Sequence, residues 1–251
     1  MSEGSFSVSM DFYDLMIDWK KRFEVELPFF KELFGHQSFI LDLACGVGRH
    51  ALEFAKWGHT VKGIDIDSQM IAKATQQANL QYFDHHVIFE TGSFEDLINR
   101  KDLNNFSYIV CIGNSLSLIR QKENLAPLIQ RLSDFLKPGG QIIFQILNYD
   151  GLEAKLPYHI LINNDSGFFL RIYESINSQQ IRFTLIPILK TPSMGWQSYQ
   201  ALESFLWKIS SDELISLLKE NEFTDIKLYG SYSKAEFTIN SPYLLVVATL
   251  G

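Results

Sequence analysis

Two carboxylates and two glycines are spaced so that they could hold a nucleotide-like ligand. Asp42 ends a short apolar run, and Gly46 and Gly48 follow it closely. The apolar pattern resumes at once in residues 51–55, which predicts a strand, a tight turn and a helix. Asp65 lies 17 residues beyond Gly48, about where an acid that binds a ribose is expected. The stretch therefore predicts that a ligand of this kind approaches the backbone at the turn.

Two classes of ligand compete for this turn, because Gly46, Gly48 and Ala51 also fit the dinucleotide fingerprint G-x-G-x-x-A. Asp42 argues against a pyrophosphate, since like charges would repel each other in a partly dry site. S-adenosylmethionine carries an ammonium and a sulfonium, so it would gain from the same carboxylate. The chain also ends in a predicted hairpin, where a nicotinamide-binding domain normally continues with a sixth parallel strand.

Strands and helices that would position these residues alternate along residues 39–147. Strands are expected at residues 39–43, 61–66, 87–90, 108–112 and 141–147. Helices are expected from the glycine turn to about Lys56, at 69–79 with Ser68 as the N-cap, and at 127–136 before Lys137-Pro138-Gly139-Gly140. Five alternations predict a parallel, doubly wound sheet.

The pattern changes after residue 150. Runs at 168–176, 181–189 and 201–209 are rich in aromatic and β-branched residues, and residues 177–180 suit a turn, so a small antiparallel insertion is expected. Ser210 and Glu213 have capping-box spacing and open a helix to about Asn221. Strands at 225–229 and 243–250 have no helix between them and should form an antiparallel hairpin at the edge of the sheet.

At the amino end, residues 10–34 have helical spacing of apolar residues, and Pro28 is expected to separate two helices. The predicted organisation is a helical cap at 1–38, a cofactor-binding core at 39–150, a β insertion serving as a substrate lid at 151–209, and a helix and hairpin at 210–251 that complete the core sheet. The expected fold is α/β: a doubly wound, mostly parallel, seven-stranded Rossmann-like sheet.

Composition narrows the class of protein. The 251 residues are 46% hydrophobic, enough for a large core, and carry a net charge of −7. Without a Lys/Arg cluster, a nucleic-acid partner is not expected. No signal peptide and no run of about 20 apolar residues is present, so no membrane association is expected and a cytoplasmic location follows by default.

Two cysteines, Cys45 and Cys111, make no disulfide framework and are expected to be thiols. The six histidines show no metal-ligand spacing, so no metal is assigned.

Residues 39–147 resemble a class I S-adenosylmethionine-dependent methyltransferase. LDLACGVGRH at 41–50 resembles the first motif of that family, GIDIDSQM at 63–70 the second, and TGSFEDL at 91–97 the adenine-contacting stretch. CIGNSLSLI and LKPGGQIIFQILNYD resemble the fourth and fifth strands with their loops. Within the class, C-I-G-N-S and N-Y-D resemble the glycine and sarcosine N-methyltransferase branch.

This resemblance implies two sets of site residues. The cofactor set is Tyr13, Trp19, Arg22, Asp42, Ala44, Gly46, Gly48, Asp65, Ile66, Met70, Ser93, Phe94, Cys111, Ile112 and Gly113. In it, Asp42 would attract the ammonium of S-adenosylmethionine, Asp65 would accept the ribose hydroxyls, and Arg22 would bind the carboxylate. The substrate set is Asn114, Ser115, Asn148 and Tyr149, which lie on loops where open α/β sheets bind ligands. Ordinary structural roles, such as a helix cap for Asp42 or core packing for Ile66 and Met70, stay open.

One departure from the resemblance concerns the methyl acceptor. Leu147 stands where glycine-type relatives have an arginine before N-Y-D, so it cannot hold a substrate carboxylate. A pocket of aromatic, aliphatic and amide groups and a less anionic small molecule are therefore expected, with glycine a poor substrate. Methyl transfer requires alignment more than covalent catalysis, so no catalytic residue is assigned.

Three functions remain open: a small-molecule methyltransferase, an NAD(P)-binding oxidoreductase, and a non-catalytic protein that binds S-adenosylmethionine. The sequence leaves the acceptor, the methylated atom and the oligomeric state undetermined.

Overall fold

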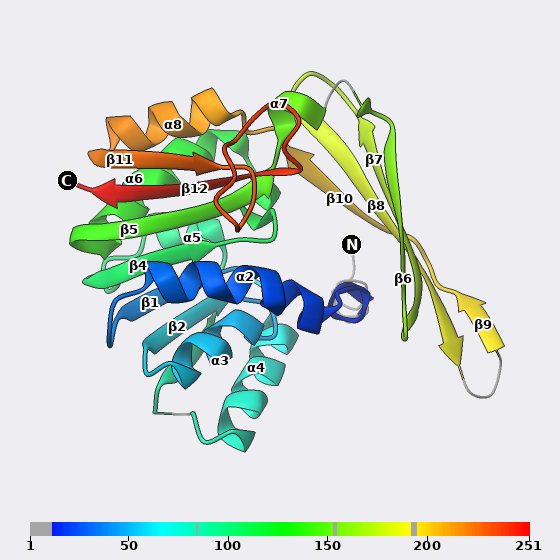
Figure 1. Ribbon diagram of the computed structural model, residues 1–251, viewed down its shortest axis with the longest axis horizontal. Coiled ribbons are helices and arrows are strands. Elements are labelled where there is room, and N and C mark those ends of the chain that lie inside the picture. The colour runs from blue at the N-terminus through cyan, green and yellow to red at the C-terminus, as the bar shows by residue number, and fades with distance from the viewer. Residues whose placement is uncertain (1–11, 84, 153–154, 192–194) are drawn as a thin grey trace.

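A computed structural model describes residues 12–83, 85–152, 155–191 and 195–251. Its main sheet has seven strands in the order β11-β12-β5-β4-β1-β2-β3 (Figure 1). The strands are β1 (Phe39–Leu43), β2 (Thr60–Asp65), β3 (Val87–Thr91), β4 (Phe106–Cys111), β5 (Leu136–Leu147), β11 (Phe223–Tyr229) and β12 (Tyr243–Leu250). Only β12 runs antiparallel to its neighbours, β5 and β11. The predicted fold class is confirmed, including the hairpin at the sheet edge.

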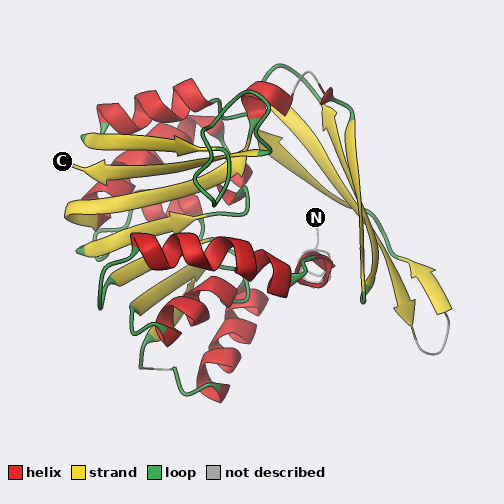
Figure 2. Cartoon of the chain, in the orientation of Figure 1, coloured by secondary structure: helices red, strands yellow, loops and turns green. Residues whose placement is uncertain are grey.

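Helices cover both faces of this sheet (Figure 2). They are α2 (Trp19–Leu33), α3 (Arg49–Lys56), α4 (Ser68–Leu80), α5 (Phe94–Ile98), α6 (Leu125–Phe135), α7 (Tyr149–Leu152) and α8 (Ser211–Glu220), with short 3₁₀ turns η1 (Ser115–Leu118) and η2 (Lys122–Asn124). Aromatic residues of α2 and α3, such as Phe30 and Phe54, pack on one face of the sheet. Leucines of α5, α6 and α8 pack on the other. The sheet is thus buried on both sides, as parallel sheets require.

Three local predictions were wrong. Pro28 does not separate two helices but lies inside α2, because the flanking Phe29 and Phe30 are buried and offset the roughly 3 kcal/mol that proline costs in a helix. The break comes earlier, between helical residues 12–16 and the N-cap Asp18; residues 10 and 11 of the predicted helix lie outside the described residues. The N-cap of α4 is Asp67 rather than Ser68, since the Asp67 carboxylate accepts from the N–H groups of Gln69 and Met70.

The third error is the start of the fifth strand. It was expected at residue 141, but β5 begins at Leu136 and runs through the Pro-Gly-Gly stretch. The strand therefore starts directly after α6, which ends at Phe135.

A second, antiparallel sheet forms the insertion, in the order β10-β8-β7-β6 with β9 paired to β8. Its strands are β6 (Tyr158–Asn164), β7 (Gly167–Ser175), β8 (Gln180–Thr191), β9 (Gly195–Ser198) and β10 (Leu202–Trp207). Strands β6 and β9 were missed in the sequence. The sheet stands beyond the carboxyl end of β5 (Figure 1). Phe12 and Met16 pack against Phe169 and Leu185 of this sheet, so the first helical residues lie between the two sheets.

Candidate cofactor and acceptor site

The glycine turn joins β1 to α3 and is tied to the end of β2. The N–H of Gly46 donates to Oδ2 of Asp65 at 2.8 Å, and the N–H of Asp67 donates to Oδ1 at 2.9 Å. Gly46 and Gly48 have φ values of +57° and +74°, and Ala44 also has a positive φ, 55°. A Cβ on Gly48 would lie 2.4 Å from the ring of Phe89, whereas a Cβ on Gly46 would meet nothing within 4 Å. Gly48 is therefore required by packing, and Gly46 leaves space over the turn.

Asp42 is a buried carboxylate with an unused hydrogen-bond acceptor. It is 3% exposed, and its Oδ2 has no hydrogen-bond partner. Burial, and then the negative charge of Asp65, raise its pKa to about 7. Burial also raises the pKa of Asp65. Two such acids at the carboxyl ends of adjacent strands favour a cationic ligand, because a positive charge would relieve both the desolvation and the repulsion.

Four residues of the predicted cofactor set follow β2 and β3. Ile66 is 46% exposed at the end of β2, whereas Met70 is buried in the first turn of α4. Ser93 and Phe94 come at the start of α5. Ser93 is its N-cap: its hydroxyl accepts from the N–H of Asp96, and its own N–H donates to the Asp96 carboxylate. The N–H of Ser93 is thus already in use.

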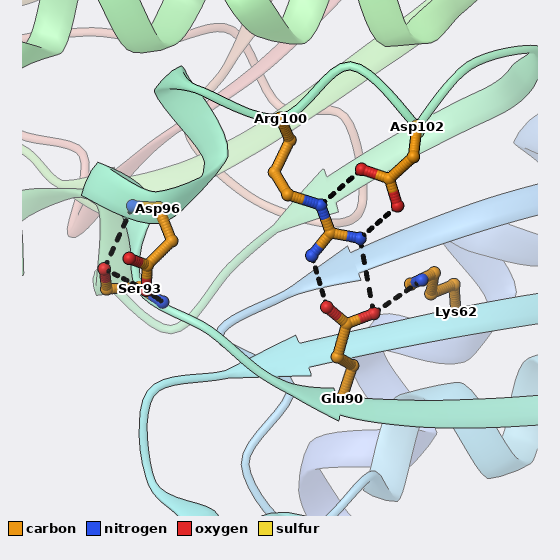
Figure 3. A network of polar contacts seen from close by, with 6 residues as sticks. All are labelled: Lys62, Glu90, Ser93, Asp96, Arg100 and Asp102. Carbon is orange, nitrogen blue, oxygen red and sulfur yellow. Dashed lines mark hydrogen bonds and ion pairs between the residues drawn. The ribbon is translucent and has the colours of Figure 1, made fainter.

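An ion-pair network holds the segment that carries Ser93 (Figure 3). Glu90 on β3 pairs with Lys62 of β2 at 2.6 Å and with Arg100, which follows α5. Arg100 also pairs with Asp102 at 2.6 Å. Arg100 thereby ties the segment after α5 to β2 and β3, while Ser93 and Asp96 bond to each other at the start of the helix.

The cap helix α2 brings a buried charged cluster to the site. Nε of Arg22 donates to Oε1 of Glu26 at 2.8 Å, and Oε2 of Glu26 lies 2.7 Å from Nε2 of His50. A Cβ on Gly113 would lie 3.8 Å from Nη2 of Arg22, so the guanidinium reaches the end of β4. Burial alone would lower the pKa of Arg22, but Glu26 outweighs it and the pKa is raised. Glu26 and His50 were not predicted, although Arg22 and Glu26 have the i,i+4 spacing of a helical ion pair.

Trp19 and Tyr13 complete the cap. The indole N–H of Trp19 donates to Asp14 at 2.8 Å, and the guanidiniums of Arg22 and Arg49 lie 5.2 and 5.4 Å from its ring centre. Tyr13 packs against the cluster that joins residues 12–16 to the insertion.

The loop after β4 is fixed by backbone and amide contacts. Cys111 and Ile112 are buried, and the N–H of Gly113 donates to the side chain of Gln145 on β5 at 2.7 Å. Asn114 has a left-handed backbone, with φ 67°. Its Oδ1 accepts from the N–H of Leu147 at 2.8 Å. The hydroxyl of Ser115 donates to the carbonyl of Ile112.

Tyr149 follows β5 and meets Asn114. Its hydroxyl lies 3.0 Å from Nδ2 and 3.2 Å from Oδ1 of Asn114. Burial raises the pKa of the Tyr149 hydroxyl well above its usual range, although hydrogen bonds from Ser117 and Asn114 oppose the shift. Tyr149 is therefore a neutral hydroxyl at physiological pH. These two residues of the predicted substrate set lie together.

The side chain of Asn148 makes its hydrogen bonds away from Asn114 and Tyr149. Its Nδ2 donates to the carbonyls of Thr238, Ile239 and Ser241 at 2.9–3.0 Å, and its Oδ1 accepts from the N–H of Gly151. The side chain is 4% exposed and joins the loop before β12 to the start of α7. Its predicted contact with a substrate stays a prediction.

The described chain also holds two cysteines and two surface hollows. Cys45 and Cys111 are both free thiols. Within the residues that the structure describes, no His, Cys, Asp and Glu side chains group as a metal site would need, and no helix could span a membrane. Two surface hollows lie away from the glycine turn, one along α4 and one beside Phe39 and Ile88.

Comparison with known proteins agrees with this geometry. Residues 40–140 match a family model described as a methyltransferase domain. The chain is 28% identical to a glycine/sarcosine/dimethylglycine N-methyltransferase of Actinopolyspora halophila over 93% of its own length and 45% of that protein. It is 24% identical to a glycine/sarcosine N-methyltransferase of Aphanothece halophytica, over 94% of this chain and 86% of the relative. Residues 40–140 therefore form a methyltransferase domain, and the comparisons support a class I S-adenosylmethionine-dependent methyltransferase.

Solved structures share the fold. An S-adenosylmethionine-dependent methyltransferase from Clostridium acetobutylicum superposes with a TM-score of 0.77 at 18% identity, over 99% of this chain and 98% of that one. The amino pentose methyltransferase CalS10 from Micromonospora echinaspora, solved with S-adenosylmethionine bound, gives 0.65 at 15% identity over 100% and 98%.

The comparisons support S-adenosylmethionine as the cofactor, and the residues at the turn fit it. The unpartnered oxygen of Asp42 suits an ammonium, and the open space over Gly46 suits a chain lying against the backbone. The cofactor assignment sets aside the NAD(P) alternative left open by the sequence.

Proposed function

We propose that this methyltransferase transfers the methyl group of S-adenosylmethionine to a nitrogen of a small-molecule amine. The observation that carries the proposal is the pair Asn114–Tyr149, a neutral amide and a neutral hydroxyl held 3.0 Å apart where β4 and β5 end. Such groups can hydrogen-bond an uncharged amine without placing a full charge beside it. Both relatives described above are named as N-methyltransferases, which supports nitrogen as the methylated atom.

When bound, S-adenosylmethionine supplies a methyl group already activated by a sulfonium. The protein then has three tasks. Asp42, Asp65 and Arg22 would hold the two ends of the cofactor, the loops at Gly113 and Asn114 would align the amine nitrogen with the methyl–sulfur bond, and the cap with the insertion would exclude water. The nitrogen lone pair forms the new N–C bond, the electrons of the C–S bond stay on sulfur, and the product ammonium loses its proton to solvent.

In this proposal, each of the predicted parts of the chain has its own role. Residues 12–38 and 155–209 would cover the site, and residues 39–150 would bind the cofactor. The acceptor is a small molecule rather than nucleic acid, a choice supported by the net charge of −7. We place the protein in the cytoplasm, where the cofactor is available.

A turnover assay tests this function. Purified protein is incubated with S-adenosylmethionine and a panel of small amines, alcohols and thiols, and S-adenosylhomocysteine release is measured together with the mass of the methylated product. We expect enzyme-level turnover with an amine, abolished in Asp65→Ala. Methylation confined to oxygen or sulfur would overturn the choice of nitrogen. Cofactor binding without turnover on any acceptor would favour the non-catalytic alternative.

A further inference from the structure

One arginine of the insertion, Arg171, lies between residues that pack on the cap and residues that pack near Tyr149. On β7, Phe169, Arg171 and Tyr173 alternate with residues of the other face, so their side chains project from the same face of the sheet. Phe169 packs with Phe12 and Met16 of the cap, while Tyr173 packs in the cluster that contains Tyr149. Arg171 lies between these two contacts. It was not among the predicted site residues.

The side chain of Arg171 leans toward the Tyr149 end. Its guanidinium carbon lies 5.3 Å from the ring centre of Tyr173 and 5.5 Å from that of Phe183, and Nη2 donates to the Tyr173 hydroxyl. Phe183 packs against both of these clusters, the one that contains Tyr149 and the one that contains Phe12 and Met16. The guanidinium therefore lies where the insertion, the cap and the loop after β5 converge.

No negative charge balances this cation. In the described part of the chain, Arg171 makes no ion pair with Asp or Glu, and its Nε is buried without a hydrogen-bond partner. Arg182, on the next strand and the opposite face, instead pairs with Glu174 at 3.0 Å. A buried guanidinium N–H that has lost water without gaining a partner destabilises the fold unless a ligand accepts from it.

The pKa of the neighbouring Tyr173 reflects the same buried surroundings. Burial is the main cause that raises the pKa of Tyr173 to about 12, Tyr13 and Tyr158 add to the shift, and Arg171 opposes it. A neutral Tyr173 cannot serve as the counter-ion of Arg171.

We propose that Arg171 is a specificity-determining residue that binds an anionic group, a carboxylate, of the methyl acceptor. This inference rests on the proposed function. A carboxylate would receive the forked donors of the guanidinium while the amine end of the same molecule lies beside Asn114 and Tyr149. This proposal departs from the uncharged pocket expected from Leu147, because it supplies a cation from the insertion rather than from the loop after β5.

Arg171 can be observed directly, without turnover. Protein labelled with ¹⁵N-arginine is saturated with S-adenosylhomocysteine, and the side-chain Nε–H signal of Arg171, assigned with Arg171→Lys, is followed by NMR. The probes are N-methylglycine, N-methyl-β-alanine and 4-(methylamino)butanoate, each beside its neutral amide, together with aminomethylphosphonate. We expect a saturable shift with at least one acid and none with its amide. No shift with any acid, or equal shifts with acid and amide, would overturn the proposal; a shift with the phosphonate alone would overturn the carboxylate.

Turnover provides the second measurement. On an acid that wild-type protein methylates, Arg171→Gln should lower kcat/KM by roughly 10–100-fold, chiefly through KM, because a charged hydrogen bond is lost. Activity on the matched amide and affinity for S-adenosylhomocysteine should stay unchanged, and Arg182→Gln should behave as wild type. An equal loss on acid and amide would contradict the inference while leaving N-methylation intact. An NMR shift without turnover would refute the proposed function and leave the anion site standing.

Discussion

Nε2 of His50 lies 2.7 Å from Oε2 of Glu26, so a buried imidazole and a buried carboxylate join α3 to α2. The other oxygen of Glu26 holds Arg22. Because α3 begins directly after the glycine turn, this contact links the cap arginine to the segment predicted to bind the cofactor.

The His50–Glu26 contact predicts acid-sensitive stability. Burial is the main cause that lowers the pKa of His50 below 6.5, so the unfolded chain takes up this proton first and stability falls as the pH drops through 6.5. Burial would raise the pKa of Glu26, but the hydrogen bond from His50 and the positive charge of Arg22 outweigh it, so this pKa is lowered and the contribution of Glu26 is lost only below pH 4.5. The raised pKa values of Asp42 and Asp65 act in the opposite direction over this range, so the expected result is a difference: in urea unfolding between pH 8 and 5.5, wild type should lose stability relative to His50→Gln as the pH drops.

His50→Gln, whose amide can still donate to Glu26, should remove the part of the pH dependence that comes from His50. Some slope should remain, because burial lowers the pKa of His59 in the same direction. An identical slope in wild type and variant would contradict this role of His50.

The two glycines of the turn should respond differently to alanine. Gly46→Ala meets only the strain of a left-handed backbone, about 1–2 kcal/mol, but its methyl fills the open space over the turn. It should weaken S-adenosylhomocysteine binding roughly tenfold or more. Gly48→Ala adds a clash with Phe89 and should destabilise by about 2–4 kcal/mol. Thermal unfolding and calorimetry separate the two effects. Equal stability losses, with cofactor affinity unchanged in Gly46→Ala, would count against this assignment.

Cofactor binding should release a proton from Asp42. In the free protein its pKa is raised to about 7, so between pH 3.8 and 7 the folded state retains a proton that the unfolded state has lost, and stability falls as pH rises. An ammonium beside the carboxylate lowers this pKa again. S-adenosylhomocysteine should therefore bind more tightly as pH rises from 5.5 to 7.5, with proton release measurable by calorimetry in two buffers. Asp42→Asn should remove most of both effects; a variant that keeps them would show that another group titrates.

Asn148 is predicted to act on the fold as well as near the substrate. Asn148→Ala removes a buried amide that donates to the carbonyls of Thr238, Ile239 and Ser241, and should destabilise by about 1–3 kcal/mol in urea unfolding. The exposed Asn163→Ala is the matched control, with a change within about 0.5 kcal/mol. If Asn148→Ala unfolds like wild type but loses acceptor binding, the substrate contact is its main role.

The sequence was most informative where a site is local. The turn at Gly46 and Gly48 and the acid at the end of β2 lie within one β-α-β unit, so spacing alone located them. Contacts between distant segments, such as Glu26 with His50 and Asn148 with residues 238–241, depend on tertiary packing and left no pattern. The position of Arg171 could have been predicted. Side chains alternate between the two faces of a strand, so Arg171 lies on the same face as Phe169 and Tyr173, which places a charge on the inward face. The prediction at Pro28 was wrong because side-chain packing outweighed the low helix propensity of proline.

A crystal structure of the complex with S-adenosylhomocysteine tests the central claim most directly. The ligand should lie along the glycine turn, with its ammonium at Asp42, its ribose hydroxyls at Asp65, its carboxylate at Arg22, and its sulfur facing the loop between Gly113 and Tyr149. A ligand bound elsewhere, or one whose sulfur points away from Asn114 and Tyr149, would contradict the account.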